Sequence, residues 1–262
     1  ALAKARDARG PLDLDLPERK VLLKADGTVD RIITPERLDA HRLIEEFMIQ
    51  ANVAAAETLE KKRTPFVYRV HDQPSLAKLE SLREFLASLD MKLAKQGVIE
   101  PELFNRILER VEETPQSYLV NEVVLRSQAQ AEYSPDNIGH FGLNLRKYAH
   151  FTSPIRRYAD LIVHRALITA CRFGDDGLPD GIEAELQGIA TSISAAERRA
   201  MTAERETIDR LIAQWLSDRV GAEFSGRIAG VTKAGLFIRL NDTGADGFVP
   251  ISTLGADYFA YD

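Results

Sequence analysis

The sequence predicts an α+β chain with a largely helical part, a few short strands, and a small all-β module at the end. Apolar residues recur at helical spacing over several long segments up to residue 216. After residue 218 the pattern changes to short alternating runs separated by Gly, Asn and Asp, which is typical of strands and turns. With 45% hydrophobic and 28% charged residues, the chain has the composition of a globular protein. We therefore expect two domains, 1–217 and 218–262.

The first elements are predicted to be alternating strands and a long helix. Residues 11–23 alternate, with leucines on one face and Asp13 and Asp15 on the other, and a hairpin turns at Asp26-Gly27. Thr34 and Pro35 predict a helix start. Apolar residues then follow at helical spacing: Leu43, Ile44, Phe47, Met48, Ala51, Ala54, Ala55 and Leu59. We expect this helix to lie at the centre of the core.

The remaining elements follow in order. A short strand is predicted at 66–70, and helices are predicted at 76–93, 101–111 and 116–131. Thr152-Ser153-Pro154 begins another helix to about residue 171, and a Gly- and Asp-rich turn separates it from a very long helix at 181–216. The β module is expected to contain strands at 224–228, 236–240 and 247–251.

Charge and cysteine content limit the partners and the compartment. The net charge of −6 by itself argues against nucleic acid, but Phe141 to Phe173 is a basic island in which Asp160 is the one acid. Its six basic residues are Arg146, Lys147, Arg156, Arg157, Arg165 and Arg172.

The single cysteine, Cys171, favours a cytoplasmic location. No apolar run predicts a membrane span, and no obligate protein partner is evident. Because the chain starts at Ala1 and stops within the β module, we expect a piece of a longer protein.

The segment His150 to Arg165 is the most informative candidate site. With Ser153 as N-cap, Arg156 and Arg157 fall in the first helical turn, where free N–H groups already favour a bound phosphate or carboxylate. Asp160 and His164 continue one polar stripe from Arg156, and the residues expected to face the core are Ile155, Tyr158 and Ile162. The alternative is a solvated helix face with an ordinary Arg–Asp ion pair.

Glu204 is a second candidate, because it interrupts the apolar stripe of the last long helix. A buried carboxylate is costly unless it is paired, so the residue indicates either an internal clamp with Arg156 or Arg157, or the edge of an RNA or phosphate site.

Other constellations give weaker signals. Strand alternation explains the spacing of Asp13 and Asp15 better than a metal pair does. The five histidines lack zinc spacing, Cys171 lacks a CxxC partner, and the GxSxG and GxxxxGK motifs do not occur.

The C-terminal module suits the first three strands of an incomplete OB barrel, whose exposed aromatic residues stack on bases. Phe237 lies near Lys233 and Arg239, which would follow a nucleic-acid backbone. Both Phe237 and Phe248 are alternatively barrel core, and for Phe248 we favour the core.

Four strings resemble a known enzyme family: EEFMIQANVAAAE (45–57), YRVHDQP (68–74), GHFGLNLRKYAHFTSPIRRYADLIVHRA (139–166) and AERRAMTAERE (196–206). They are similar to the C-terminal part of the catalytic domain of the ribonuclease II/ribonuclease R exoribonucleases, and the pattern is closer to bacterial ribonuclease R. The segment from Gly226 resembles the RNA-binding OB barrel that follows in that family.

The resemblance implies a processive 3′→5′ exoribonuclease that hydrolyses single-stranded and structured RNA to nucleoside 5′-monophosphates with Mg²⁺. It implies that Arg156 holds the scissile phosphate and that Glu204 lies near the active end of the RNA channel, so both are candidate catalytic residues. The other candidate RNA-binding residues are Arg146, His150, Arg157, Tyr158, Lys233 and Phe237.

One departure from the family pattern limits this expectation. The family binds its metal through a cluster of aspartates, and no such string occurs in this sequence. We therefore expect no metal ligands in this chain and no RNA degradation by the isolated chain. The alternatives are a non-catalytic RNA-binding or scaffold protein of the same fold and an unrelated helical phosphate-binding protein.

Overall fold

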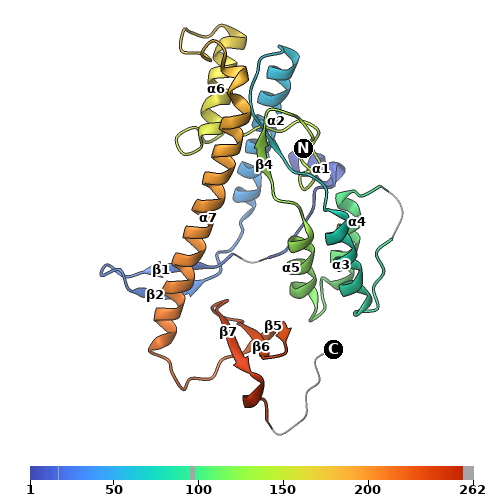
Figure 1. Ribbon diagram of the computed structural model, residues 1–262, viewed down its shortest axis with the longest axis vertical. Helices are drawn as coiled ribbons and strands as arrows, with labels where there is room; N and C mark the ends of the chain where they lie inside the picture. Colours follow the sequence, from blue (N-terminus) through green and yellow to red (C-terminus); the bar gives the residue numbers. More distant parts are fainter. Residues whose placement is uncertain (17, 95–97, 256–262) are drawn as a thin grey trace. The chain divides into compact units, whose positions relative to one another are not determined.

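The chain forms two compact units in a computed structural model, which describes all residues except 17, 95–97 and 256–262 (Figure 1). Unit 1 consists of residues 1–16 and 37–198, and unit 2 consists of residues 17–36 and 199–262. Helices dominate unit 1 and short antiparallel strands recur in unit 2, so the α+β prediction is confirmed. Among the described residues, no helix has both the length and the apolar character needed to cross a bilayer.

Unit 1 is built around two groups of helices. Its elements are α1 (Leu2–Arg9), α2 (Asp39–Lys61), β3 (Tyr68–Val70), α3 (Leu76–Ala87), α4 (Pro101–Val111), α5 (Ser117–Ser127), β4 (Glu132–Ser134), α6 (Tyr158–Cys171) and the first part of α7 (Leu186–Ser217). Helices α3, α4 and α5 pack into one core around Leu79, Phe104 and Val120 (Figure 1). Helix α2 packs on α6, and Leu59 and Val163 belong to the core that they share with β3.

Unit 2 contains a hairpin and a three-stranded sheet. The hairpin pairs β1 (Lys20–Leu23) with β2 (Val29–Ile33), as predicted. The sheet is antiparallel in the order β5 (Gly226–Thr232), β6 (Gly235–Leu240), β7 (Asp246–Pro250), and all three strands were predicted. Near the end of α7 the Arg219 guanidinium lies 3.4 Å from the centre of the Trp215 ring.

The start of α2 and its buried face differ from the prediction. The helix begins at Asp39 and not at Thr34-Pro35, because the His41 imidazole accepts the Leu38 N–H (3.1 Å) and caps the helix there. The predicted apolar residues Leu43, Ile44, Phe47 and Met48 are exposed. The buried face instead carries Glu46, Ile49, Asn52, Ala55, Ala56 and Leu59. Two polar residues occupy this face because each finds a partner elsewhere in unit 1.

Helix α1 and strand β4 were not predicted, and helices α3 and α5 end earlier than predicted. Helix α1 buries no residue, so it has no apolar stripe, and it ends at Gly10 in a left-handed conformation (φ 62°). Helix α5 stops at Ser127, and the chain then forms β4, which pairs antiparallel with β3. Helix α3 stops at Ala87.

Candidate functional site

The segment from His150 to Arg157, here called the arginine loop, has no regular secondary structure, and side chains from two helices hold its backbone. Asn52 of α2 accepts the Phe151 N–H (2.8 Å). His164 of α6 bonds to the Phe151 carbonyl oxygen through Nε2 (2.9 Å), and Asp160 of α6 accepts the Ser153 N–H (2.7 Å). Side-chain hydrogen bonds thus replace a sheet or helix ladder and fix the course of the loop.

The predicted helix start at Ser153 is wrong. Helix α6 begins at Tyr158, with Arg157 at its N-cap in an extended conformation, and the residues before it form a turn. The turn at Ser153 does not continue into a helix because Arg157 is extended, and the fully buried Asp160 carboxylate binds Arg157 and also accepts the Ser153 N–H. The Arg157 guanidinium binds the same carboxylate in bidentate fashion, through Nε and Nη2 at 2.8 Å each.

The two neighbouring arginines therefore have different environments. Arg157 is held by Asp160, whereas Arg156 is exposed and makes no ion pair within the described part of the chain. The expectation that Ile155 and Tyr158 face the core is also wrong, since they are 98% and 50% exposed. Ile162 is buried as expected. The arginine loop presents Arg156 to solvent from a backbone fixed on the interior side.

His150 is held between two tyrosine rings. Its Nδ1 lies 2.9 Å from the Tyr133 hydroxyl, and the Tyr133 and Tyr148 ring centres lie 5.6 and 5.8 Å from its own. Burial lowers the pKa of His150 from 6.5 to about 2 and raises the pKa of Tyr133 to about 12. At neutral pH the imidazole is uncharged, so it offers a phosphate no cationic contact.

Two further histidines continue this array of rings. The His140 ring centre lies 5.3 Å from that of Tyr148 and 5.1 Å from that of His71. Burial lowers the pKa of both imidazoles, that of His140 to about 3. His71 accepts the Gly142 N–H (2.8 Å), and a Cβ at position 142 would lie only 2.9 Å from the same ring nitrogen. Only glycine allows this approach without a shift.

Arg69 of β3 supports the same region from the other side. The backbone N–H of Arg69 donates to the Tyr148 carbonyl oxygen (2.9 Å), and its guanidinium lies 4.8 Å from the centre of the Tyr133 ring. The guanidinium also forms an ion pair with Glu197 of α7 (2.6 Å). Sequence reasoning missed this set, because its members are far apart in sequence and no spacing links them.

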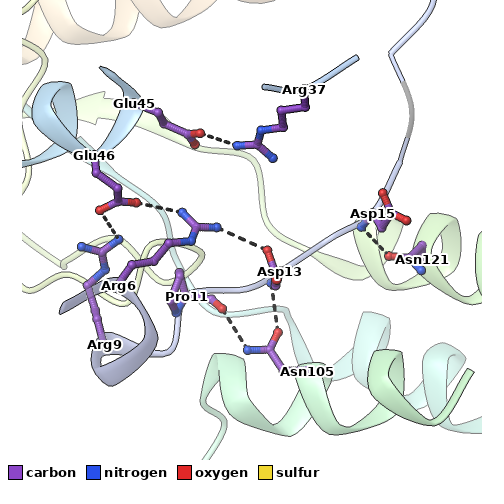
Figure 2. A network of polar contacts seen from close by, with 10 residues as sticks. All are labelled: Arg6, Arg9, Pro11, Asp13, Asp15, Arg37, Glu45, Glu46, Asn105 and Asn121. Carbon is purple, nitrogen blue, oxygen red and sulfur yellow. Dashed lines mark hydrogen bonds and ion pairs between the residues drawn. The ribbon is translucent and has the colours of Figure 1, made fainter. Parts of the chain in front are cut away.

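A second polar network joins α1, α2 and residues 10–16, here called the N-terminal segment (Figure 2). The Glu46 side chain is buried and accepts from Arg6 Nη1 (3.0 Å), while Arg9 Nη2 lies 3.6 Å from its other oxygen. Arg6 also binds the exposed Asp13 carboxylate through Nη2 (3.3 Å). A carboxylate on the buried face of α2 is thus paired with two arginines.

The N-terminal segment is extended but is not a β-strand, which corrects the prediction of an alternating strand. Asn105 accepts the Asp13 N–H (3.0 Å) and donates to the Pro11 carbonyl oxygen (2.9 Å), and Asn121 accepts the Asp15 N–H (2.8 Å) (Figure 2). The predicted alternation holds: Leu12 and Leu14 pack on the α3–α5 core. Asp13 and Asp15 point away from that core as expected.

The remaining candidates lie in unit 2, apart from Arg146, which is an exposed residue of unit 1. Glu204 is exposed, so the expectation of a buried carboxylate is wrong; nearby Met201 is 57% exposed, and the apolar stripe does not bury this part of α7. Phe237 and Phe248 are directly paired across β6 and β7, with ring centres 5.1 Å apart. They are 44% and 45% exposed, so the prediction that Phe248 lies in the core of the barrel is wrong. Lys233 is exposed in the turn before β6.

Of the sequence-predicted residues, the structure brings His150, Arg156, Arg157 and Tyr158 together at the arginine loop. The structure adds Asn52 and Tyr133 to Asp160 and His164 as residues that hold the loop. Asn52 gave one signal in the sequence: it is a polar residue within an alanine-rich helical stretch. That signal indicates a buried hydrogen-bonded group, but it does not identify the partner.

Comparison with known proteins gives consistent matches over the whole chain. The RNB domain model matches residues 1–172, more than half of the chain, and the S1 RNA binding domain model matches residues 217–261. Ribonuclease R of Escherichia coli is 42% identical over all of this chain, which covers 33% of that protein.

Solved structures agree with these matches. The apo form of Mycoplasma genitalium RNase R has a TM-score of 0.89 at 30% identity, covering 100% of this chain and 41% of that one. The same protein in complex with ribose methylated single-stranded RNA has a TM-score of 0.88 at 30% identity, with the same coverage of both chains. The chain spans about a third of the length of the curated relatives that it matches.

Proposed function

Because the chain belongs to the RNB domain family, with Ribonuclease R among its homologues, we propose that it forms part of a processive, Mg²⁺-dependent 3′→5′ exoribonuclease. Such an enzyme would hydrolyse single-stranded and structured RNA to nucleoside 5′-monophosphates in the cytoplasm. The match to an S1 RNA binding domain and the RNA complex of the Mycoplasma relative support RNA as the substrate.

The observation that carries the proposal is the contrast between Arg156 and Arg157. A carboxylate holds the Arg157 guanidinium, whereas Arg156 is exposed at the end of a loop with a fixed backbone. Phosphoryl transfer depends mainly on positioning and on neutralising phosphate oxygens, and a preorganised arginine suits this task. We therefore assign the scissile phosphate to Arg156.

The other site residues divide into ligands and supports. We propose positioning roles for Arg157, which is bound to Asp160, and for His150, whose lowered pKa keeps it uncharged. Exposure supports direct RNA contacts for Arg146, Tyr158, Lys233 and Phe237 and a place for Glu204 beside the RNA. Phe237 would stack on a base, because each base has a π-face that an aromatic ring can meet.

The described residues do not fit a Mg²⁺ ion. No group of three or more His, Cys, Asp or Glu side chains arranged to hold a metal occurs among them, and the Asp13 carboxylate is paired with Arg6. Mg²⁺ prefers an octahedral set of oxygen ligands that includes carboxylates.

The role of Arg156 is tested in the full-length protein that contains this chain. We expect Arg156→Ala to lower kcat on single-stranded RNA about 100-fold, as the loss of a preorganised donor typically does, with little change in RNA affinity. Arg146→Ala is the matched control, since it removes an exposed arginine of the same basic island and should weaken binding alone. Weaker binding with unchanged kcat in Arg156→Ala would refute the catalytic assignment.

The isolated 262-residue chain provides a second test. We expect it to bind single-stranded RNA but not to degrade it in Mg²⁺, because the described residues lack a metal cluster. Robust exonuclease activity of the pure chain would overturn this proposal. A full-length protein that binds RNA without degrading it would favour the non-catalytic scaffold instead.

A further inference from the structure

Asn52 links the central helix α2 to the arginine loop. Its side chain is 2% exposed, and both ends of the amide are used. Oδ1 accepts the Phe151 N–H (2.8 Å), and Nδ2 donates to the Tyr148 hydroxyl (3.0 Å). We propose that Asn52 is a positioning residue that fixes Arg156 for phosphate binding, an inference that rests on the proposed function of Arg156.

The side chains that anchor the loop belong to two different helices. Asp160 and His164 lie seven and thirteen residues from the atoms that they bind, and both belong to α6, the helix that the loop itself enters. They fasten the loop to α6. Asn52 is 99 residues from Phe151, so it fastens the loop to a different helix. Loss of Asn52 would leave the loop attached to α6 but free to shift relative to α2.

The position requires the chemistry of asparagine. A carboxamide presents one acceptor and a donor group at the same distance from the backbone. Aspartate would keep the acceptor but bring a buried charge and lose the donor, and leucine would fill similar space with neither. Leaving the Phe151 N–H and the Tyr148 hydroxyl without partners in the interior is unfavourable, so the loop would move to satisfy them.

The direct test is Asn52→Leu in the full-length protein. We expect kcat on single-stranded RNA to fall about 10- to 100-fold, because small misplacements of a catalytic group have effects of this size, while KM changes little. Tyr148→Phe removes the bond to Nδ2 and keeps the Phe151 bond, so it should fold and show a smaller loss of kcat. A wild-type kcat in both variants would overturn the inference.

Asn121→Leu is the matched control for a general loss of stability. Asn121 is 3% exposed and also uses both amide ends, accepting from the Asp15 N–H and donating to the Ser117 carbonyl oxygen. We expect it to lower the unfolding midpoint about as much as Asn52→Leu but to leave kcat nearly unchanged. Equal losses of kcat in the two variants would show that Asn52 acts through folding alone.

A double-mutant cycle separates this inference from the proposed function. If Asn52 acts through Arg156, Asn52→Leu should cause no further loss of kcat in the Arg156→Ala background. Losses that multiply would overturn the positioning role. An unchanged kcat in Arg156→Ala alone would overturn the proposed role of Arg156 and this inference with it, whereas a full effect of Arg156→Ala without any effect of Asn52→Leu would overturn the inference alone.

Discussion

The arginine loop and the N-terminal segment both lack regular secondary structure, and asparagine side chains hold both. In the N-terminal segment, Asn105 and Asn121 bind the N–H groups of Asp13 and Asp15, two residues apart, and the backbone is extended. In the arginine loop, the carbonyl of Ser153 accepts from two later N–H groups, and the backbone turns. The same carboxamide chemistry thus supports an extended chain or a turn, depending on which backbone groups are bound.

The two regions differ in how their charges are paired. Asp160 is fully buried and satisfied by three hydrogen bonds from Arg157 and the Ser153 N–H. The polar network of α1, α2 and the N-terminal segment, here called the N-terminal network, is less complete. Among the described residues, no hydrogen-bond partner is found for Arg9 Nε, Arg9 Nη2 and one oxygen of Glu46. We infer that the arginine loop is the more rigid of the two.

The largest expected effect is at Asp160. Asp160→Ala should lower the free energy of unfolding by about 3–5 kcal/mol, because it leaves the largely buried Arg157 guanidinium and the Ser153 N–H without a partner. Urea denaturation of the 262-residue chain measures this change. A loss below about 1 kcal/mol, which is typical of exposed pairs, would remove the contrast between the two regions.

The histidines near the arginine loop should make the stability of the protein sensitive to acid, whereas the N-terminal segment contains no histidine. Burial lowers the folded-state pKa of His71, His140 and His150, so below about pH 6.5 the unfolded chain takes up protons that the folded chain does not. The free energy of unfolding should therefore fall as the pH drops from 6.5 towards 3, by up to about 1.4 kcal/mol per pH unit for each histidine.

A conservative variant isolates this effect from that of the carboxylates. His140→Asn keeps an acceptor for the Leu143 N–H but removes the titrating ring. Unfolding experiments between pH 6.5 and 4.5 should then give a shallower dependence than in the wild type. An identical slope in the two proteins would show that His140 does not contribute.

The smallest expected effect is at Asp13. Its side chain is 78% exposed, and the ion pair with Arg6 is 3.3 Å long. Asp13→Ala should lower the free energy of unfolding by less than about 1 kcal/mol, as is usual for exposed pairs. A loss as large as that of Asp160→Ala would mean that the N-terminal network, with Glu46 at its centre, is as tightly coupled as the arginine loop.

The periodic elements could be predicted from the sequence, and the family resemblance was found from four strings. Helix α4 matches its predicted bounds, and the three strands of the unit 2 sheet, β5, β6 and β7, lie within a few residues of their predicted bounds. Amphipathic spacing and turn residues are local properties, so the sequence reveals them directly.

The geometry of the site could not be predicted in the same way. Ser153-Pro154 has the pattern of a helix start, but the buried Asp160 carboxylate binds Arg157, which is extended, and the helix begins only at Tyr158. The buried face of α2 likewise depends on the partners of Glu46 and Asn52, which come from α1 and from residues 148 and 151. Contacts between residues so far apart leave no periodic signal.

The stacked Trp215–Arg219 pair has a practical consequence for spectroscopy. Trp215 is the single tryptophan of the chain and lies in unit 2, whereas the buried tyrosines Tyr68, Tyr133 and Tyr148 all lie in unit 1. Tryptophan fluorescence thus follows the environment of unit 2, and the near-ultraviolet circular dichroism of the tyrosines follows unit 1. Recording both signals in one denaturation experiment would show whether the two units unfold together, since a two-state transition requires that they coincide.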